Sequence, residues 1–314
     1  MTAALQRILV IKLGALGDFL QALGPFAAIR NHHRGAHVTL LTTAPYREMA
    51  EACGYFDDVR LDSRPKFLNP GGWLRLRRGL RGGKFDRVYD LQTSDRSGFY
   101  FYLFFPGPFP EWSGIVRGAS HPHANPKRDF LHTRDRQAEQ LRMAGIPEVP
   151  RPALDWMRAD ISRFPLSKPY ALLVPGGAPH RPRKRWPEAR YAELANRLLA
   201  QGIQPLLLGT AAEAATLGTI AKACAGAVNL GGKTSLFEIA ELARGACAAI
   251  GNDTGPMHLI AQTGAPTVVL FSGASDPALC APTGTRVAIL KREPLDGLAT
   301  AEVEAALHAL GAAA

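Results

Sequence analysis

The sequence has 314 residues, of which 46% are hydrophobic and 20% charged. This composition supports a hydrophobic core and excludes an intrinsically disordered chain, and the length suggests two domains of ordinary size. The formal net charge of +10 is unevenly placed, because residues 1–165 carry 24 basic and 16 acidic side chains while residues 166–314 carry 13 and 11. The first half is therefore expected to meet something anionic: nucleic acid, a membrane surface or an acidic acceptor.

Strand and helix signals alternate along the first half. Strands are predicted at residues 7–13, 38–41, 59–61 and 87–91, and helices at 19–33, 46–53 and 133–144. Lys12 and Asp18 interrupt the first apolar run and no small-residue cleavage site follows, so a core strand is favoured over a signal peptide. No run has the length of a transmembrane helix.

The same alternation returns after a proline-spaced stretch, residues 147–169, which has the composition of a linker. Strands are predicted at 170–174, 204–208, 246–250, 267–271 and 286–290, and helices at 187–200, 213–224, 235–244, 255–263 and 300–310. The predicted fold is α/β, with two doubly wound Rossmann-like domains at 1–165 and 166–314. The four cysteines are scattered without zinc-like spacing, which is typical of reduced thiols in a cytoplasmic protein.

The stretch from Ile250 to Phe271 reads as strand, polar turn, helix and strand. Gly255 and Pro256 open the helix behind Asp253 and Thr254, and Gly264 ends it. The unpaired N–H groups of such a helix start suit a phosphate. An ordinary capped crossover helix is the alternative, but the small and polar turn, followed by Met257 and His258, favours a ligand site.

Other strand ends also carry candidate groups. Asp18 follows Gly14 and Gly17 after the first strand, where it is either a helix cap or a carboxylate that can accept a proton. The spacing of these glycines does not match a dinucleotide fingerprint.

In the second half, Gly176 and Gly177 let backbone approach a ligand, and Lys184 stands in a basic stretch that can bind a diphosphate. A solvated loop is favoured for Arg181, Arg183 and Arg185. Glu213 can accept hydrogen bonds from a ribose or simply favour a helix start.

Three motifs together resemble glycosyltransferase family 9, the ADP-heptose:lipopolysaccharide heptosyltransferases. They are Leu16-Gly-Asp18, Lys184-Arg-Trp-Pro187 and Asp253-Thr-Gly-Pro-Met-His258, the last followed by Phe271 and Asp276-Pro277. The resemblance spans nearly the whole chain. It implies a GT-B fold with two domains facing a cleft, and it leaves open that the last helix packs back on the N-terminal domain. It also implies an inverting transfer that uses no metal and no cofactor, with an ADP-linked nucleoside-diphosphate sugar as donor.

By this resemblance Asp18 matches the general base and Lys184 the phosphate-binding lysine. Glu213 matches a ribose carboxylate, and the turn at Asp253, Thr254 and Gly255 matches the one that contacts sugar and phosphate. The departures are Pro179 and His180 near the phosphates, 271–276 in place of a Gly-Pro-Thr-Asp motif, and an extra Gly24 in the first helix. They bear on the donor's sugar and base more than on the reaction.

Two alternatives from other classes are a dinucleotide-dependent oxidoreductase and a non-enzymatic nucleic-acid-binding protein. The missing fingerprint speaks against the first, and no nucleic-acid-binding signature accompanies the basic residues, so no nucleic acid is expected as partner. The expected partners are a nucleotide sugar and an anionic glycolipid or glycan acceptor. The segment from Arg64 to Arg87 holds eight basic residues around Trp73, Leu74, Leu76 and Leu80, which suggests peripheral docking on the cytoplasmic face of an inner membrane. A solvated helix packed on the N-terminal sheet is the plainer alternative.

Overall fold

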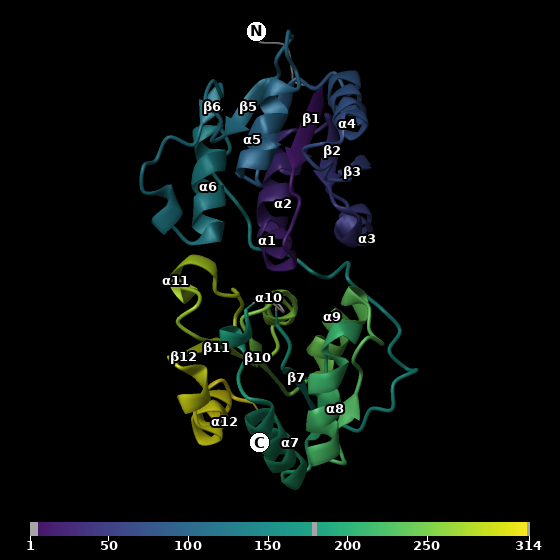
Figure 1. Ribbon diagram of the computed structural model, residues 1–314, viewed down its shortest axis with the longest axis vertical. Helices are drawn as coiled ribbons and strands as arrows, with labels where there is room; N and C mark the ends of the chain where they lie inside the picture. Colours follow the sequence, from purple (N-terminus) through teal and green to yellow (C-terminus); the bar gives the residue numbers. More distant parts are fainter. Residues whose placement is uncertain (1–5, 178–180, 313–314) are drawn as a thin grey trace. The chain divides into compact units, whose positions relative to one another are not determined.

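The computed structural model describes residues 6–177 and 181–312. The chain forms two compact units, residues 1–156 and 157–314, each of which holds one six-stranded, fully parallel sheet (Figure 1). The boundary lies within the proline-spaced stretch, nine residues before the one read from the sequence. Residues 157–165 group with the second unit because Met157 is buried, its carbonyl accepts from Arg244 Nη1 at 2.6 Å, and Arg163 pairs with Glu238.

The first unit alternates strands and helices. Its strands are β1 Arg7–Ile11, β2 His37–Thr42, β3 Asp58–Leu61, β4 Arg87–Asp90, β5 Glu111–Gly114 and β6 His121–Pro122. Its helices are α1 Leu16–Gln21, α2 Leu23–His32, α3 Arg47–Ala52, α4 Pro70–Gly82, α5 Asp95–Tyr102 and α6 Thr133–Met143. The sheet order is β3-β2-β1-β4-β5-β6, so the order reverses between β1 and β4.

The second unit repeats this organisation. Its strands are β7 Tyr170–Val174, β8 Gln204–Leu207, β9 Val228–Asn229, β10 Ala248–Asn252, β11 Thr267–Phe271 and β12 Val287–Lys291. Its helices are α7 Glu188–Ala200, α8 Ala214–Ala223, α9 Leu236–Gly245, α10 Gly255–Gln262, α11 Pro277–Cys280 and α12 Thr300–Ala309. The order β12-β11-β10-β7-β8-β9 places the reversal between β7 and β10. Two doubly wound sheets confirm the predicted fold class.

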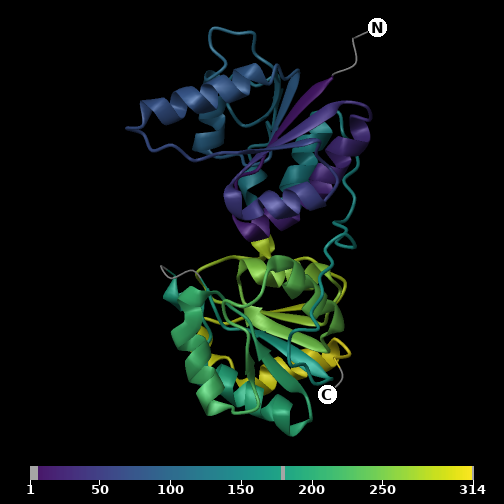
Figure 2. The same ribbon diagram turned by 90° about the vertical axis from the view of Figure 1, so that its right-hand side faces the viewer.

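Helices cover both faces of the first sheet (Figure 2). Leu80 of α4 and Tyr100 of α5 pack with Leu9 and Ile11 on one face, while α2 and α6 contact each other on the other. One departure from the sequence expectation is that the helix at 19–33 is two helices, broken at Ala22. Pro25 explains the break, since it cannot donate to the carbonyl four residues earlier and its ring crowds that carbonyl.

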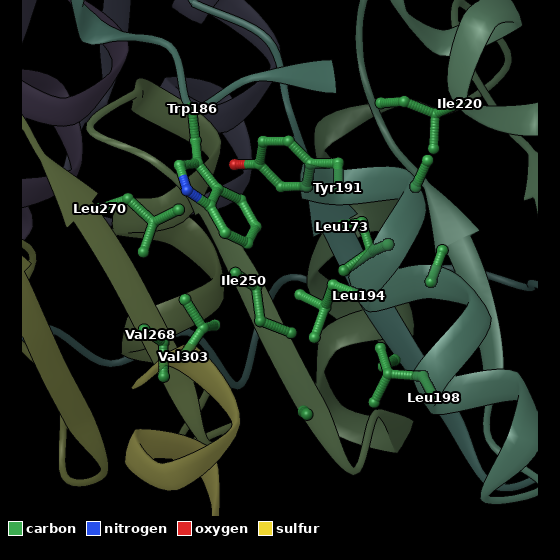
Figure 3. Close-up of a cluster of buried hydrophobic side chains, with 14 of the residues drawn as sticks. Leu173, Trp186, Tyr191, Leu194, Leu198, Ile220, Ile250, Val268, Leu270 and Val303 are labelled. Atoms are coloured by element: carbon green, nitrogen blue, oxygen red, sulfur yellow. The ribbon is translucent and has the colours of Figure 1, made fainter. Parts of the chain in front are cut away.

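The core of the second unit lies under α7, α8 and α12. It joins Trp186, Tyr191 and Leu194 to Ile250 and Val268 of the central strands (Figure 3). Val303 and Leu307 of α12 are buried in the same cluster. The closing helix therefore packs on the core of its own unit, because its apolar side chains fill the face of the second sheet.

Candidate functional site

In a doubly wound sheet, ligands bind outside the carboxyl ends of the strands, at the point where the strand order reverses. In the second unit this point lies between β7 and β10. Gly176 and Gly177 follow β7, and Asp253, Thr254 and Gly255 follow β10. The topology thus brings the two candidate stretches of the second half to one edge of one sheet.

Lys184 and Asp253 form an ion pair at this edge. The Lys184 Nζ lies 2.5 Å from Asp253 Oδ2, and the two side chains are only 11% and 8% exposed. Ser275 donates its hydroxyl to the same carboxylate oxygen at 2.7 Å. An ammonium group has three donors, so Lys184 keeps further N–H groups for a phosphate while Asp253 holds the side chain in place.

Gly176 allows close packing at the end of β7, because a Cβ there would lie 1.7 Å from Glu213 Oε1. A Cβ on Gly177 would make only ordinary van der Waals contacts, the one with Thr254 Cγ2 at 3.7 Å. The Gly177 N–H donates to Glu213 Oε1 at 2.8 Å, and Glu213 Oε2 accepts from the Thr210 N–H at 2.7 Å. Glu213 therefore links the backbone of Gly177 to that of Thr210, the residue with which Glu213 forms a capping box.

At the start of helix α10, some backbone N–H groups are already used in hydrogen bonds and others are available to a ligand. The N–H of Met257 donates to the Thr254 carbonyl at 3.1 Å, and that of Asp253 donates to Leu270 at 3.0 Å. Within the described ranges no acceptor is recorded for the N–H groups of Thr254 and Gly255 or for the buried Thr254 hydroxyl. Met257 and His258 themselves are buried. The candidate N–H groups for donating hydrogen bonds to a phosphate at this turn are thus those of Thr254 and Gly255 rather than that of Met257.

Five other residues singled out from the sequence need separate mention. Pro179 and His180 lie outside the described residues. Arg183 is exposed, whereas Arg185 donates from Nη2 to the Gly177 carbonyl at 2.7 Å and so is part of the loop structure, not a solvated side chain. Asp276 caps α11 by accepting from the Ala278 N–H at 3.1 Å.

In the first unit the candidate turn follows β1. Gly14 has φ +123°, and a Cβ there would lie 2.8 Å from the ring of Tyr46. The adjoining Leu13 carbonyl accepts from Thr43 Oγ1 at 3.1 Å and from Arg64 Nη2 at 2.7 Å. Gly14 is required here because other residues avoid this backbone conformation and the ring occupies the space.

Asp18 lies in the first turn of α1 and is partly exposed. Within the described residues, no hydrogen bond or ion pair is recorded for its carboxylate. Gly17 beside it is buried. Asp18 is therefore not a side-chain cap of its helix, and the carboxylate is available to accept a proton.

Two buried charged groups stand behind this turn. Burial lowers the pKa of Lys12, whose Nζ donates to the Leu91 carbonyl at 3.0 Å, while the carboxylates of Asp18 and Asp90 oppose that shift. Burial also raises the pKa of Asp90 to about 6, although its Oδ1 accepts from the N–H groups of Gln92 and Thr93. Lys12 and Asp90 thus place two buried titratable groups behind the turn that carries Asp18.

Sequence reasoning missed two polar residues of the second unit. Ser275 was noted only as part of a departing motif, and Asn252 only as part of the turn. A polar side chain directly after an apolar strand run is the signal that could have singled out Asn252.

Comparisons with known proteins bear on the family and the fold of the chain. The sequence profile described as Glycosyltransferase family 9 (heptosyltransferase) matches residues 73–304, the family that the motifs indicated. Lipopolysaccharide heptosyltransferase 2 of Escherichia coli is 26% identical over 315 residues, covering 91% of this chain and 88% of the relative. The match leaves the oxidoreductase and nucleic-acid-binding alternatives without support.

Solved structures share the fold. A glycosyl transferase family 9 structure from Veillonella parvula has a TM-score of 0.85 at 19% identity and covers 99% of this chain and 98% of its own. The structure of an E. coli ADP-heptose lipopolysaccharide heptosyltransferase II has a TM-score of 0.76 at 23% identity, with 97% and 98% covered. At these identities the likeness concerns the fold.

Proposed function

The chain belongs to glycosyltransferase family 9, and from this premise we propose that it transfers a heptose from ADP-heptose to a lipopolysaccharide-core or related glycan. Membership makes the protein a glycosyltransferase. The donor and acceptor are proposed from the relatives, one of which is named for ADP-heptose and another for lipopolysaccharide. The observation that carries the proposal is the Lys184–Asp253 pair beside the glycine backbone at the end of β7.

The second unit would bind the donor. Lys184 and the N–H groups of Thr254 and Gly255 supply positive charge and hydrogen-bond donors for a diphosphate. A helix terminus alone contributes roughly 0.3–2 kcal/mol, so the lysine is the stronger ligand for the leaving group. Glu213 would accept from the ribose, although both of its oxygens already accept from backbone N–H groups, so the ribose must share them.

The first unit would supply the base. The Asp18 carboxylate removes the proton from an acceptor hydroxyl while that oxygen attacks the anomeric carbon of the donor. The bond from that carbon to the diphosphate oxygen breaks, and the nucleoside diphosphate leaves with the negative charge. A single displacement of this kind inverts the anomeric centre. A positioned base typically contributes about 10²–10⁴ in rate.

The proposal includes no metal and no cofactor, since Lys184 supplies the positive charge at the leaving group. The test is direct. Chelator is added to an assay of the full chain with ADP-heptose and a lipid-linked core acceptor, and product is detected by its mass. Undiminished transfer supports the proposal, whereas an absolute requirement for a divalent ion, or transfer only from donors with another base, would sink it.

We also propose that the first unit docks on an anionic lipid surface, but through fewer residues of the segment from Arg64 to Arg87 than the sequence suggested. Of the apolar side chains in α4, Leu80 is buried and Trp73 and Leu76 pack partly against the core, so the plainer alternative holds for these three. Arg77 and Arg81 donate to backbone carbonyls of residues 104–107. They are therefore used to hold that loop.

The remaining exposed groups still combine charge with apolar area. We call them the α4 surface: Lys66, Phe67, Leu68, Leu74, Arg75 and Arg78. Phe67 and Leu68 are 90% and 88% exposed. Apolar anchors beside cationic side chains are complementary to anionic headgroups over an acyl layer. None of the helices in the described ranges combines the length and hydropathy of a membrane span.

A further inference from the structure

Asn252 ends β10 and directly precedes Asp253. Its side chain is fully buried, with 0% of the residue exposed. A buried amide is costly unless its hydrogen-bonding groups are satisfied, so its partners show what the residue holds together. The inference below rests on the proposed donor site and concerns how that site is kept in shape.

All four hydrogen-bonding positions of the Asn252 amide are filled. Its Nδ2 donates to the carbonyls of Pro175 and Gly176 at 2.7 and 3.1 Å. Its Oδ1 accepts from the Trp186 N–H at 3.0 Å and from the Tyr191 hydroxyl at 3.1 Å. The partners fix the orientation of the amide, because two are carbonyls that only accept and one is an N–H that only donates.

These partners belong to the segments that surround the candidate donor site. The two carbonyls are in the loop whose next residue, Gly177, donates to Glu213. The Trp186 N–H lies two residues after Lys184, which in turn pairs with Asp253, the neighbour of Asn252. One side chain thus ties the glycine loop after β7 and the lysine segment before α7 to the turn after β10.

We propose that Asn252 is a positioning residue for the donor site. It fixes the spacing between the glycine loop, whose Gly177 contacts Glu213, and Lys184, which faces a diphosphate in the proposed function. Loops at strand ends are free to vary unless side chains hold them, and misplacement of a ligand group by about 1 Å weakens a site strongly. Trp186 and Tyr191 anchor the other side of the amide in the core, with ring centroids 5.0 Å apart (Figure 3).

The chemistry of the contact predicts which substitutions fail. Asn252→Asp keeps an oxygen for Trp186 and Tyr191 but places a second carboxylate oxygen against two carbonyls, which repels the glycine loop. Asn252→Ala leaves both carbonyls and the Trp186 N–H without a partner. Both variants should therefore displace the segments that bind the diphosphate, even where the unit stays folded.

A purely structural role is separated by a matched control. Leu194→Ala opens a cavity in the same core but removes none of the four hydrogen bonds of Asn252, and so lowers the thermal midpoint by packing alone. ADP affinity is measured by calorimetry on the folded full chain, well below each midpoint, with donor and acceptor KM alongside. We expect both Asn252 variants to weaken ADP binding at least tenfold and to raise the donor KM, with the acceptor KM unchanged. Leu194→Ala should leave ADP affinity within twofold.

Lys184→Ala is titrated in parallel to test the donor site itself. If Lys184→Ala weakens ADP binding while both Asn252 variants bind like wild type, the positioning inference is wrong and the proposed function stands. If Lys184→Ala has no effect, the donor site is wrong. Equal loss of affinity in Leu194→Ala, or failure of both Asn252 variants to fold at low temperature, would overturn the inference in favour of a structural role.

Discussion

At the strand-order reversal of the first sheet, β4 ends in the buried carboxylate of Asp90, whereas at that of the second sheet β10 ends in the buried amide of Asn252. Burial raises the pKa of Asp90 to about 6, while the amide carries no charge and makes four hydrogen bonds. The same topological position is thus titratable in one unit and insensitive to pH in the other.

The carboxylates in the turns at these two reversals differ as well. Asp253 is held by Lys184 and Ser275, whereas no hydrogen bond or ion pair is recorded for the Asp18 carboxylate in the described part of the chain. A carboxylate held by a lysine fixes that ammonium group where a phosphate can meet it. In the proposed function this difference corresponds to proton transfer in the first unit and anion binding in the second.

The largest expected effect follows from replacing the free carboxylate. Asp18→Asn removes the base and should lower kcat by about 10²–10⁴, because the amide cannot take the acceptor proton. The thermal midpoint should stay near that of wild type, since no hydrogen bond is lost. Steady-state transfer with both substrates saturating measures the effect. A kcat within a few-fold of wild type would remove Asp18 from the chemistry.

The titration of Asp90 should make the free energy of unfolding of the first unit depend on pH. The folded pKa of Asp90, about 6, lies above its ordinary value of 3.8. The folded state therefore binds more protons between these values, and its contribution to stability is full below pH 4 and is lost as pH rises through 6. The pKa difference corresponds to roughly 3 kcal/mol.

Asp90→Asn should abolish this dependence, because an amide does not titrate. The fold should be kept, because the amide oxygen can still accept from the N–H groups of Gln92 and Thr93. Urea unfolding of both proteins from pH 4 to 8 gives the difference in free energy of unfolding, which should shift in favour of the variant as pH rises. Curves that stay parallel across this range would contradict the assignment.

Removing the Lys184 ammonium group should have a smaller effect on turnover than removing the Asp18 carboxylate. Lys184→Ala should lower kcat about 10–100-fold, since a hydrogen bond to a charged group contributes roughly 1.5–3 kcal/mol. Arg183→Ala is the matched control, because Arg183 is an exposed neighbour of the same charge. Comparable losses in the two variants would mean a diffuse basic loop without a specific phosphate ligand.

The smallest effect concerns the α4 surface. Arg75→Gln with Arg78→Gln should lower sedimentation with anionic vesicles about 10–30-fold, at roughly 1 kcal/mol for each charge, and raise the acceptor KM. The control is Lys222→Gln with Lys291→Gln, an equal charge change on exposed positions of the second unit. Docking on lipid is excluded if wild type does not sediment, or if the control loses as much binding.

Long apolar runs made most of the fold predictable. The strands Tyr170–Val174 and Thr267–Phe271 have the bounds read from the sequence, because each is a continuous buried run between turn signals. The strands Glu111–Gly114, His121–Pro122 and Val228–Asn229 were missed, since two to four residues of mixed polarity carry no periodic signal. Their pairing is decided by neighbouring strands.

The site was predictable as residue types and strand-end positions, but not as contacts. The pairing of Lys184 with Asp253 and the four contacts of Asn252 join residues up to 77 positions apart. No local pattern encodes such partners. The roles of Arg77 and Arg81 were hidden for the same reason, because the carbonyls they reach belong to the loop after α5.

The division of labour between the units is tested most directly by calorimetric titration of ADP into wild type, Asp18→Asn and Lys184→Ala. The account predicts that Asp18→Asn binds ADP with the affinity of wild type, and that Lys184→Ala binds it at least tenfold more weakly. If Asp18→Asn weakens ADP binding as much as Lys184→Ala, or if neither variant changes it, the assignment of proton transfer to the first unit and anion binding to the second is contradicted.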